Sequence, residues 1–163
     1  MAGFIHSLIA CICMLGAALT VGGCNYSYSK PDIAQLWGVL GAGVFDTLKA
    51  PESVDYYQVV AALPGTGPQT YQPANKVQAL SAEDTGKLQK MLLNDKSYHF
   101  GVTKTCVFVP ETAFRFKKGN KDVLVLVSMN CKQVKYDLGE QAIRLDIDPI
   151  ADNFTEFLNG LKK

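Results

Sequence analysis

The charges of this sequence are placed unevenly, and their placement divides the chain into two parts. Residues 1–29 contain no Asp, Glu, Lys or Arg, so all 16 Lys and Arg and all 15 Asp and Glu residues follow Ser29. The second part has the composition of one globular domain, whereas the first has the character of a targeting or membrane segment. We expect a single folded domain over residues 32–163.

The uncharged part holds an apolar run from Leu8 to Leu19. Its 12 residues match the hydrophobic region of a signal peptide and fall short of the roughly 20 that span a bilayer. The run is followed by Val21-Gly22-Gly23-Cys24, in which a branched apolar residue and two small residues precede a cysteine. This pattern resembles the lipobox of a bacterial lipoprotein precursor.

The resemblance implies a lipid anchor. Residues 1–23 would be a removed signal peptide, Cys24 would carry the lipid, and residues 24–31 would form a tether. Each buried methylene of the acyl chains adds about 0.8 kcal/mol to membrane binding. Asn25 stands where an inner-membrane enterobacterial lipoprotein has Asp, so the resemblance favours the outer membrane of a bacterial cell envelope.

Two alternatives to lipidation stay open, because Met1–Ser7 lacks the Lys or Arg of a typical signal peptide. The first is an ordinary secretory signal, since Val21 and Gly23 also suit a secretory cleavage site, and it would release a soluble domain. The second is an uncleaved anchor that extends from Phe4 to Val21.

The cysteine count agrees with this division of the chain. Cys11 and Cys13 would leave with the signal peptide and lipidation would use Cys24, so Cys106 and Cys131 remain as one pair. In an oxidising compartment the simplest state of such a pair is a structural disulfide. The alternative is a redox-active pair, which usually has a Cys-x-x-Cys spacing at a helix start.

A long hairpin is expected in the second half of the chain. Gly119-Asn120 suits a two-residue hairpin turn, flanked by arms over Lys104–Lys117 and Asp122–Cys131. The second arm is rich in Val and Leu and is therefore expected to be central in a sheet. The turn sets Lys118 opposite Lys121.

Counting outward from this turn tests whether the two cysteines can meet. The register places Cys106 opposite Gln133 and diagonal to Cys131, on the same face of the hairpin. Pro110 must lie at an edge or a bulge, and a bulge there would bring the cysteines into direct opposition. The disulfide is therefore within reach.

The remaining patterns predict helices around a small sheet. Apolar spacing indicates a helix over Asp32–Leu48 with Leu36, Trp37 and Leu40 on its buried face, although its three glycines weaken it. Other expected elements are a strand over Ser53–Val60, a helix capped by Ser81, a strand over Ile143–Ile147 and a final helix capped by Asp148. We expect an α+β domain with a mostly antiparallel sheet of about four strands and helices packed on one face.

From the helix at Ser81 to the closing helix, the order of elements resembles that of small uncharacterised bacterial lipoproteins, a resemblance that brings no activity with it. No residue pattern indicates catalysis either. His99 has no nucleophile or orienting carboxylate nearby in sequence. Asp146, Asp148 and Asp152 surround a strand-to-helix junction where a cation is conceivable, but capping and the helix dipole explain Asp148 and Asp152. We expect no catalytic residue, no metal and no cofactor.

Local charge suggests a binding surface. The net charge of +1 argues against nucleic acid. Lys104–Lys135 holds seven basic residues against two acidic ones, and Asp137–Glu156 holds six acidic residues against one basic one. The hairpin residues expected to meet a partner protein are Arg115, Lys117, Lys118 and Lys121. These lysines equally suit strand edges that resist aggregation.

The sequence thus predicts a membrane-anchored envelope lipoprotein with a non-enzymatic binding or structural role and an envelope protein as its candidate partner. Two alternatives remain: an envelope redox accessory or enzyme that uses Cys106 and Cys131, and a secreted inhibitor-like domain that binds a partner through the basic hairpin.

Overall fold

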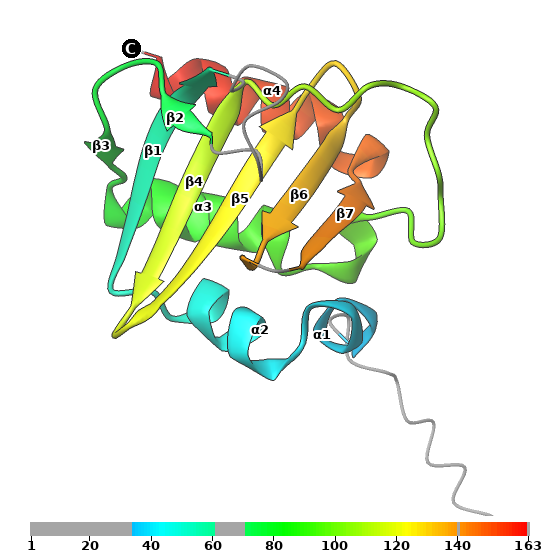
Figure 1. The fold of residues 1–163 in the computed structure, drawn as a ribbon, viewed down its shortest axis with the longest axis horizontal. Helices are drawn as coiled ribbons and strands as arrows, with labels where there is room; N and C mark the ends of the chain where they lie inside the picture. Colours follow the sequence, from blue (N-terminus) through cyan, green and yellow to red (C-terminus); the bar gives the residue numbers. More distant parts are fainter. Residues whose placement is uncertain (1–33, 61–70, 140, 163) are drawn as a thin grey trace, which may run out of the picture.

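The computed structural model describes residues 34–60, 71–139 and 141–162. Its helices are α1 (Ala34–Leu40), α2 (Ala42–Lys49), α3 (Ala82–Leu92) and α4 (Ala151–Leu161), with short 3-10 turns η1 (Asp95–Ser97) and η2 (Asp148–Ile150). Helices α3 and α4 lie behind a sheet, and α1 and α2 lie along its lower end (Figure 1). None of these helices has the length and apolar character needed to cross a bilayer.

The sheet is antiparallel at every strand pair, which confirms the predicted α+β class. The strands follow the order β2-β1-β4-β5-β6-β7, and β3 also pairs with β1. They are β1 (Ser53–Val60), β2 (Gln72–Pro73), β3 (Gln78–Ala79), β4 (Thr112–Lys118), β5 (Lys121–Ser128), β6 (Gln133–Asp137) and β7 (Ala142–Asp146).

The predicted number of strands was too low. Strands β2 and β3 have two residues each, too few to show a period. Strand β6 was missed although its sequence alternates, with Val134 and Tyr136 buried on one face of the sheet. The predicted arm ending at Cys131 instead stops at Ser128, and a turn leads into β6.

The β4–β5 hairpin has the predicted register. Lys118 pairs with Lys121, and Gly119 adopts the positive φ of 58° that the two-residue turn requires. The first arm is shorter than predicted, because Pro110 has no N–H to donate to the ladder. The ladder therefore begins with the Glu111 N–H, which donates to the carbonyl of Val127 over 3.0 Å.

This shorter arm corrects the predicted position of the disulfide. Cys106 does not lie on a strand opposite Gln133. It lies in the segment 101–110, which runs past the edge strand β7 and along the upper end of the sheet to β4 (Figure 1). Cys131 lies in the turn between β5 and β6, and its Cα is 5.9 Å from that of Cys106.

The first predicted helix is in fact two helices. Gly41 has a φ of 77°, which ends α1 before α2 begins. Leu36 and Leu40 are buried as predicted, but Trp37 is 50% exposed, so its predicted burial was wrong. The carboxylate of Asp95 accepts hydrogen bonds from the backbone N–H groups of Gln35 and Leu36 at 2.9 and 2.8 Å, which holds the start of α1.

The predicted N-terminal cap is correct for α3 and wrong for α4. Ser81 caps α3 as expected, with its hydroxyl oxygen accepting a hydrogen bond from Asp84 N–H at 3.0 Å. Asp148 does not cap α4. The chain passes through η2 first, and α4 begins after Ile150 without a side-chain cap.

The main core lies between the sheet and the helices. Phe114 is fully buried, and its ring centroid is 5.6 Å from Tyr56, 6.4 Å from Phe154 and 6.2 Å from Phe157. The opposite side of the sheet, which we call the second face, has a smaller buried cluster of Tyr57, Ala113 and Leu126. Tyr71 and Phe108 pack against that cluster from outside the sheet.

Truncation of Phe114 tests this arrangement. We expect Phe114→Ala to lower the free energy of unfolding by about 3–5 kcal/mol, because it opens a cavity between the sheet and α4. Urea unfolding followed by circular dichroism measures the loss. Val107→Ala is the control, since Val107 is 75% exposed. Equal effects of the two substitutions would contradict the assigned core.

Candidate functional site

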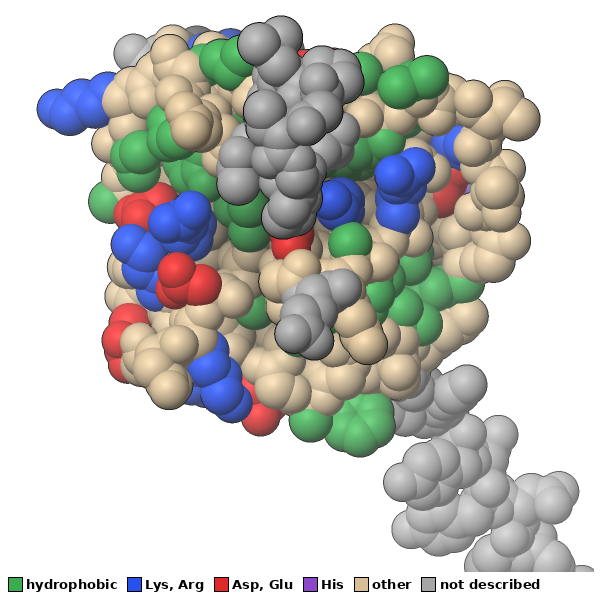
Figure 2. Space-filling view, in the orientation of Figure 1, with side chains coloured by type: hydrophobic (Ala, Val, Ile, Leu, Met, Phe, Trp, Pro, Cys, Tyr) green, Lys and Arg blue, Asp and Glu red, His purple; other side chains and the backbone are tan. Residues whose placement is uncertain are grey.

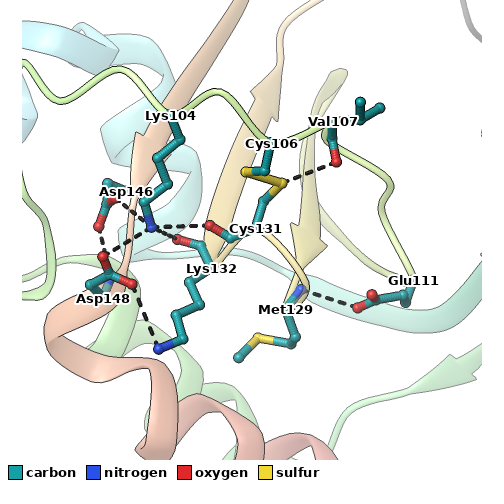
Figure 3. Close-up of a disulfide and its surroundings, with 9 residues drawn as sticks. All are labelled: Lys104, Cys106, Val107, Glu111, Met129, Cys131, Lys132, Asp146 and Asp148. Carbon is teal, nitrogen blue, oxygen red and sulfur yellow. Dashed lines mark hydrogen bonds and ion pairs between the residues drawn. A yellow bond between two sulfur atoms is a disulfide. The ribbon is translucent and has the colours of Figure 1, made fainter.

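The candidate site lies at the upper corner of the sheet, where three parts of the chain meet. Segment 101–110, the turn between β5 and β6, and the end of β7 come together around the side chain of Lys104 (Figure 3). Just before segment 101–110, an isolated β-bridge joins His99 to Asp146 at the end of β7, and the His99 N–H donates to the Asp146 carbonyl at 3.1 Å. The corner therefore joins residues that are far apart in sequence.

Lys104 connects these parts through its ammonium group. Its Nζ lies 2.6 Å from Oδ2 of Asp146 and 3.0 Å from Oδ2 of Asp148. The same group donates to the backbone carbonyls of Cys131 and Lys132, at 3.0 and 3.4 Å. Asp146 is almost fully buried, so this ammonium supplies the counter-charge that a buried carboxylate needs.

The pKa values at this corner agree with the contacts. Partial burial alone would lower the pKa of Lys104, but its hydrogen bonds to Asp146 and Asp148 raise it above the ordinary value. The hydrogen bond from Lys104 lowers the pKa of Asp148 in turn. Both groups are therefore charged at neutral pH, and the pair is an ion pair.

The disulfide lies directly beside Lys104 and confirms the predicted pairing of Cys106 with Cys131 (Figure 3). Cys131 is buried and Cys106 is half-buried. The carbonyl oxygen of Val107 lies 3.0 Å from Sγ of Cys131. Neither cysteine is at the start of a helix, the position that usually lowers a thiol pKa for redox chemistry.

A candidate cation-binding group also lies at this corner. His99, Asp146 and Asp148 bring ligand atoms within 4.8 Å of one another. The ammonium of Lys104 already lies between the two carboxylates, and Lys132 Nζ lies 3.9 Å from Oδ1 of Asp148, so two lysines supply counter-charge to the two carboxylates. Asp152, the third carboxylate considered from the sequence, is exposed in the first turn of α4 and is not part of this group.

Three buried polar side chains form a row across the second face below segment 101–110. Ser128, Gln133 and Asp146 are direct neighbours on β5, β6 and β7. Ser128 Oγ and Gln133 Oε1 have no hydrogen-bond partner among the described residues. A buried acceptor without a partner costs about 1–3 kcal/mol. Polar groups that are buried at such a cost in folding free energy are typical of functional sites.

The next row of this face contains a pair of like charges. Lys135 on β6 lies directly opposite Arg144 on β7. Like charges at directly opposed positions destabilise a sheet. Lys135 Nζ lies 3.7 Å from Asp137 and 5.2 Å from the ring centre of Tyr71, whereas the Arg144 guanidinium lies 4.8 Å from the ring centre of Phe108. These aromatic contacts offset part of the repulsion.

A cavity of about 310 Å³ opens beside this pair. Figure 2 shows Lys and Arg side chains on this face of the molecule. The described residues that line the cavity are Val102, Thr103, Lys104, Gln133, Lys135, Ala142 and Arg144. Three cationic residues and the buried Gln133 therefore line one small volume.

The predicted hairpin surface does not carry an isolated block of positive charge. Lys117 Nζ lies 2.8 Å from Oδ2 of Asp55, and Asp122 lies directly opposite Lys117 in the ladder. Lys118 donates to the carbonyl of Asp46 in α2 at 3.2 Å. The charge counted along the sequence is therefore partly balanced by residues of β1 and β5.

The other predicted positions separate in space. Arg115 projects from the second face opposite Asp55 and Leu124, while Lys121 lies beside Gly43 of α2. Cys24, the predicted lipidation site, lies outside the described residues. Comparisons with protein-family models, curated proteins and solved structures find no match to this chain.

Sequence reasoning missed the roles of Lys104, Gln133, Lys135 and Arg144. The alternation of Gln133, Lys135 and Asp137 with buried residues was a signal that could have placed them on one face of a strand. No sequence pattern indicated that Lys104 would reach Asp146 and Asp148, because that contact depends on how segment 101–110 crosses the sheet.

Removing the ammonium of Lys104 tests the corner. We expect Lys104→Met to lower the free energy of unfolding at neutral pH by about 2 kcal/mol, because it leaves the Asp146 carboxylate without its counter-charge. Urea unfolding of the two proteins measures the difference. Lys87→Met is the control, since Lys87 and Glu83 form an exposed pair on α3.

The same comparison has a defined pH dependence. The lowered pKa of Asp148 makes its contribution complete above the ordinary carboxyl value of 3.8 and lost as the pH falls through the lowered pKa. The raised pKa of Lys104 makes its contribution complete below 10.5 and lost as the pH rises through the raised pKa. A difference between the proteins that stays constant through both limits would contradict the ion pair.

Proposed function

We propose that this protein is a lipid-anchored module of the bacterial envelope with a non-enzymatic binding role. The observation that carries the proposal is the use of its cysteines. Three cysteines follow the signal-like residues 1–23, namely Cys24, Cys106 and Cys131. Because Cys106 and Cys131 bond to each other, Cys24 is left for another use. It follows Val21-Gly22-Gly23, where a lipobox has its modified cysteine.

The disulfide favours the binding role over the redox alternative. Cys131 is buried, and both cysteines are held in irregular chain next to the Lys104 ion pairs. A structural bond of this kind suits a compartment outside the cytosol. The like charges and unpartnered polar atoms on the second face supply a surface on which a ligand can be bound.

Helix α1 supports a defined orientation on the membrane. At about 3.5 Å per residue, the chain between Cys24 and Ala34 holds α1 within about 35 Å of the lipid. No residue of α1 is charged, and Trp37 and Val39 are 50% and 39% exposed. Hydrophobic side chains gather at the lower end of the molecule (Figure 2), the end where α1 and α2 lie (Figure 1). Tryptophan is enriched at membrane–water interfaces, so we place this end against the bilayer.

Processing at Cys24 is tested by intact mass. We expect the protein expressed in a bacterial host to begin at Cys24, to carry acyl groups, and to lack two hydrogens because of its single disulfide. It should fractionate with membranes, whereas Cys24→Ala should lose the acyl mass. An unmodified chain in the soluble fraction would contradict the anchor. A disulfide that cycles under mild reductant and forms mixed disulfides would favour the redox alternative.

The orientation is tested by the fluorescence of Trp37, the one tryptophan of the sequence. For the lipidated protein in phosphatidylcholine–phosphatidylglycerol vesicles, we expect a blue-shifted emission and quenching by brominated lipid, because the indole enters the interface. The Cys24→Ala protein in buffer gives the reference spectrum.

Two glycine substitutions, one a test and the other its matched control, probe this orientation. A Cβ at Gly38 of α1 or at Gly160 of α4 meets no atom within 4 Å, so both positions accept a side chain without a clash. Gly38→Glu should reduce the quenching because it places a charge beside Trp37, whereas Gly160→Glu near the opposite end should not. Quenching that is absent in the lipidated protein, or insensitive to Gly38→Glu, would overturn the orientation but not the anchor.

A further inference from the structure

We propose that the cavity lined by Gln133, Lys135 and Arg144 binds a phosphate group that carries one protonated oxygen, either as monohydrogen phosphate or as the singly ionised end of a small phosphate ester. The inference names a ligand class for the proposed binding role and rests on that role, but it does not depend on the lipid anchor.

The two cations provide the first argument. Lys135 and Arg144 are directly opposed on β6 and β7, and both line the cavity. Among the described residues no carboxylate lies within 4.0 Å of the Arg144 guanidinium, and the carboxylate nearest to Lys135 Nζ is Asp137 at 3.7 Å. An anion between the two side chains would convert their repulsion into two attractions. The planar guanidinium also presents paired N–H groups that match the oxygens of a phosphate.

Gln133 provides the second and independent argument. Its residue is only 4% exposed, it lines the cavity, and its Oε1 has no hydrogen-bond partner in the described chain. Oε1 itself has almost no accessible surface, so a ligand reaches it only when the Gln133 side chain turns toward the cavity. A carbonyl oxygen accepts hydrogen bonds and cannot donate them, so that ligand must bring an O–H or N–H group. A phosphate with one protonated oxygen supplies that donor, and its ionised oxygens face the cations. Sulfate has no proton at neutral pH and leaves the amide oxygen unsatisfied.

The surroundings restrict the ligand further. Lys104 forms another wall of the cavity, but its ammonium is held by Asp146 and Asp148. Its charge is therefore largely balanced, and Lys135 and Arg144 remain as the principal anion-binding groups. The volume of about 310 Å³ accommodates a phosphate together with a small attached group. Val102 and Ala142 supply apolar wall for that group.

Isothermal titration of the full mature chain with inorganic phosphate and with sulfate, at neutral pH and equal ionic strength, tests the site. We expect saturable heat with phosphate, a parallel rise in melting temperature, and markedly weaker binding of sulfate. Arg144→Gln should weaken phosphate binding about tenfold or more, because it removes charge-assisted hydrogen bonds. Its melting temperature without phosphate should change little, since relief of the repulsion offsets the lost contact with Phe108.

Two further variants complete the test. Lys90→Gln removes an exposed charge on α3 and should leave phosphate binding unchanged. Gln133→Leu should reduce the preference for phosphate over sulfate, because it removes the acceptor that reads the proton. The proposal is overturned if phosphate gives no saturable signal, or if Arg144→Gln binds it as well as the parent protein does. These results leave the intact mass at Cys24 unaffected, so failure of this site is distinguishable from failure of the anchor.

Competition with bound phosphate at about pH 6, where about half of the molecules of a phosphate monoester keep their last proton, then identifies the source of the group. Glucose 6-phosphate represents a soluble phosphate ester, and dihexanoyl phosphatidic acid below its micelle concentration represents a lipid headgroup. Displacement by the sugar phosphate alone assigns a soluble ligand, and displacement by the phosphatidic acid alone assigns a lipid.

Discussion

The two central strands bury apolar side chains on both faces of the sheet, and much of the remaining structure follows from that requirement. Phe114 on β4 and Val125 on β5 face α4, while Ala113 and Leu126 on the same strands face the other way. A sheet that is apolar on both faces needs two covers. Helices supply the first. On the other side, Phe108 and Tyr71 cover the cluster, so segment 101–110 has to pass over the end of the sheet.

The passage of this segment explains the chemistry of the upper corner. A chain that crosses a sheet without pairing to it needs other interactions to hold it, and here these are a disulfide and an ammonium group with four oxygen neighbours. The disulfide attaches the segment to the turn between β5 and β6. The ammonium of Lys104 binds that turn and also the carboxylates at and just after the end of β7. The same crossing encloses Ser128 and Gln133, whose polar atoms remain unpartnered within the described chain. Structural support and candidate binding surface thus share one origin.

Local features of the fold could be predicted from the sequence, whereas contacts between distant segments could not. The strand Ser53–Val60, the Ser81 cap and the pairing of Lys118 with Lys121 depend on short patterns, and all three were predicted correctly. Gly41 was counted as a weak helical residue, although it ends a helix. Asp148 had the sequence context of a helix cap, but Lys104 binds its carboxylate, and only the path of segment 101–110 brings the two together.

The disulfide also changes the topology of the chain. The covalent loop between Cys106 and Cys131 encloses the whole of β4 and β5, which are the central strands of the sheet. In an unfolded chain, closing a loop of this length removes conformational entropy equivalent to about 3.5 kcal/mol. The ends of the hairpin thus stay close even when the chain is unfolded. A protease that cuts between Gly119 and Asn120 would therefore leave two pieces joined by one covalent bond, so both central strands would stay part of one molecule.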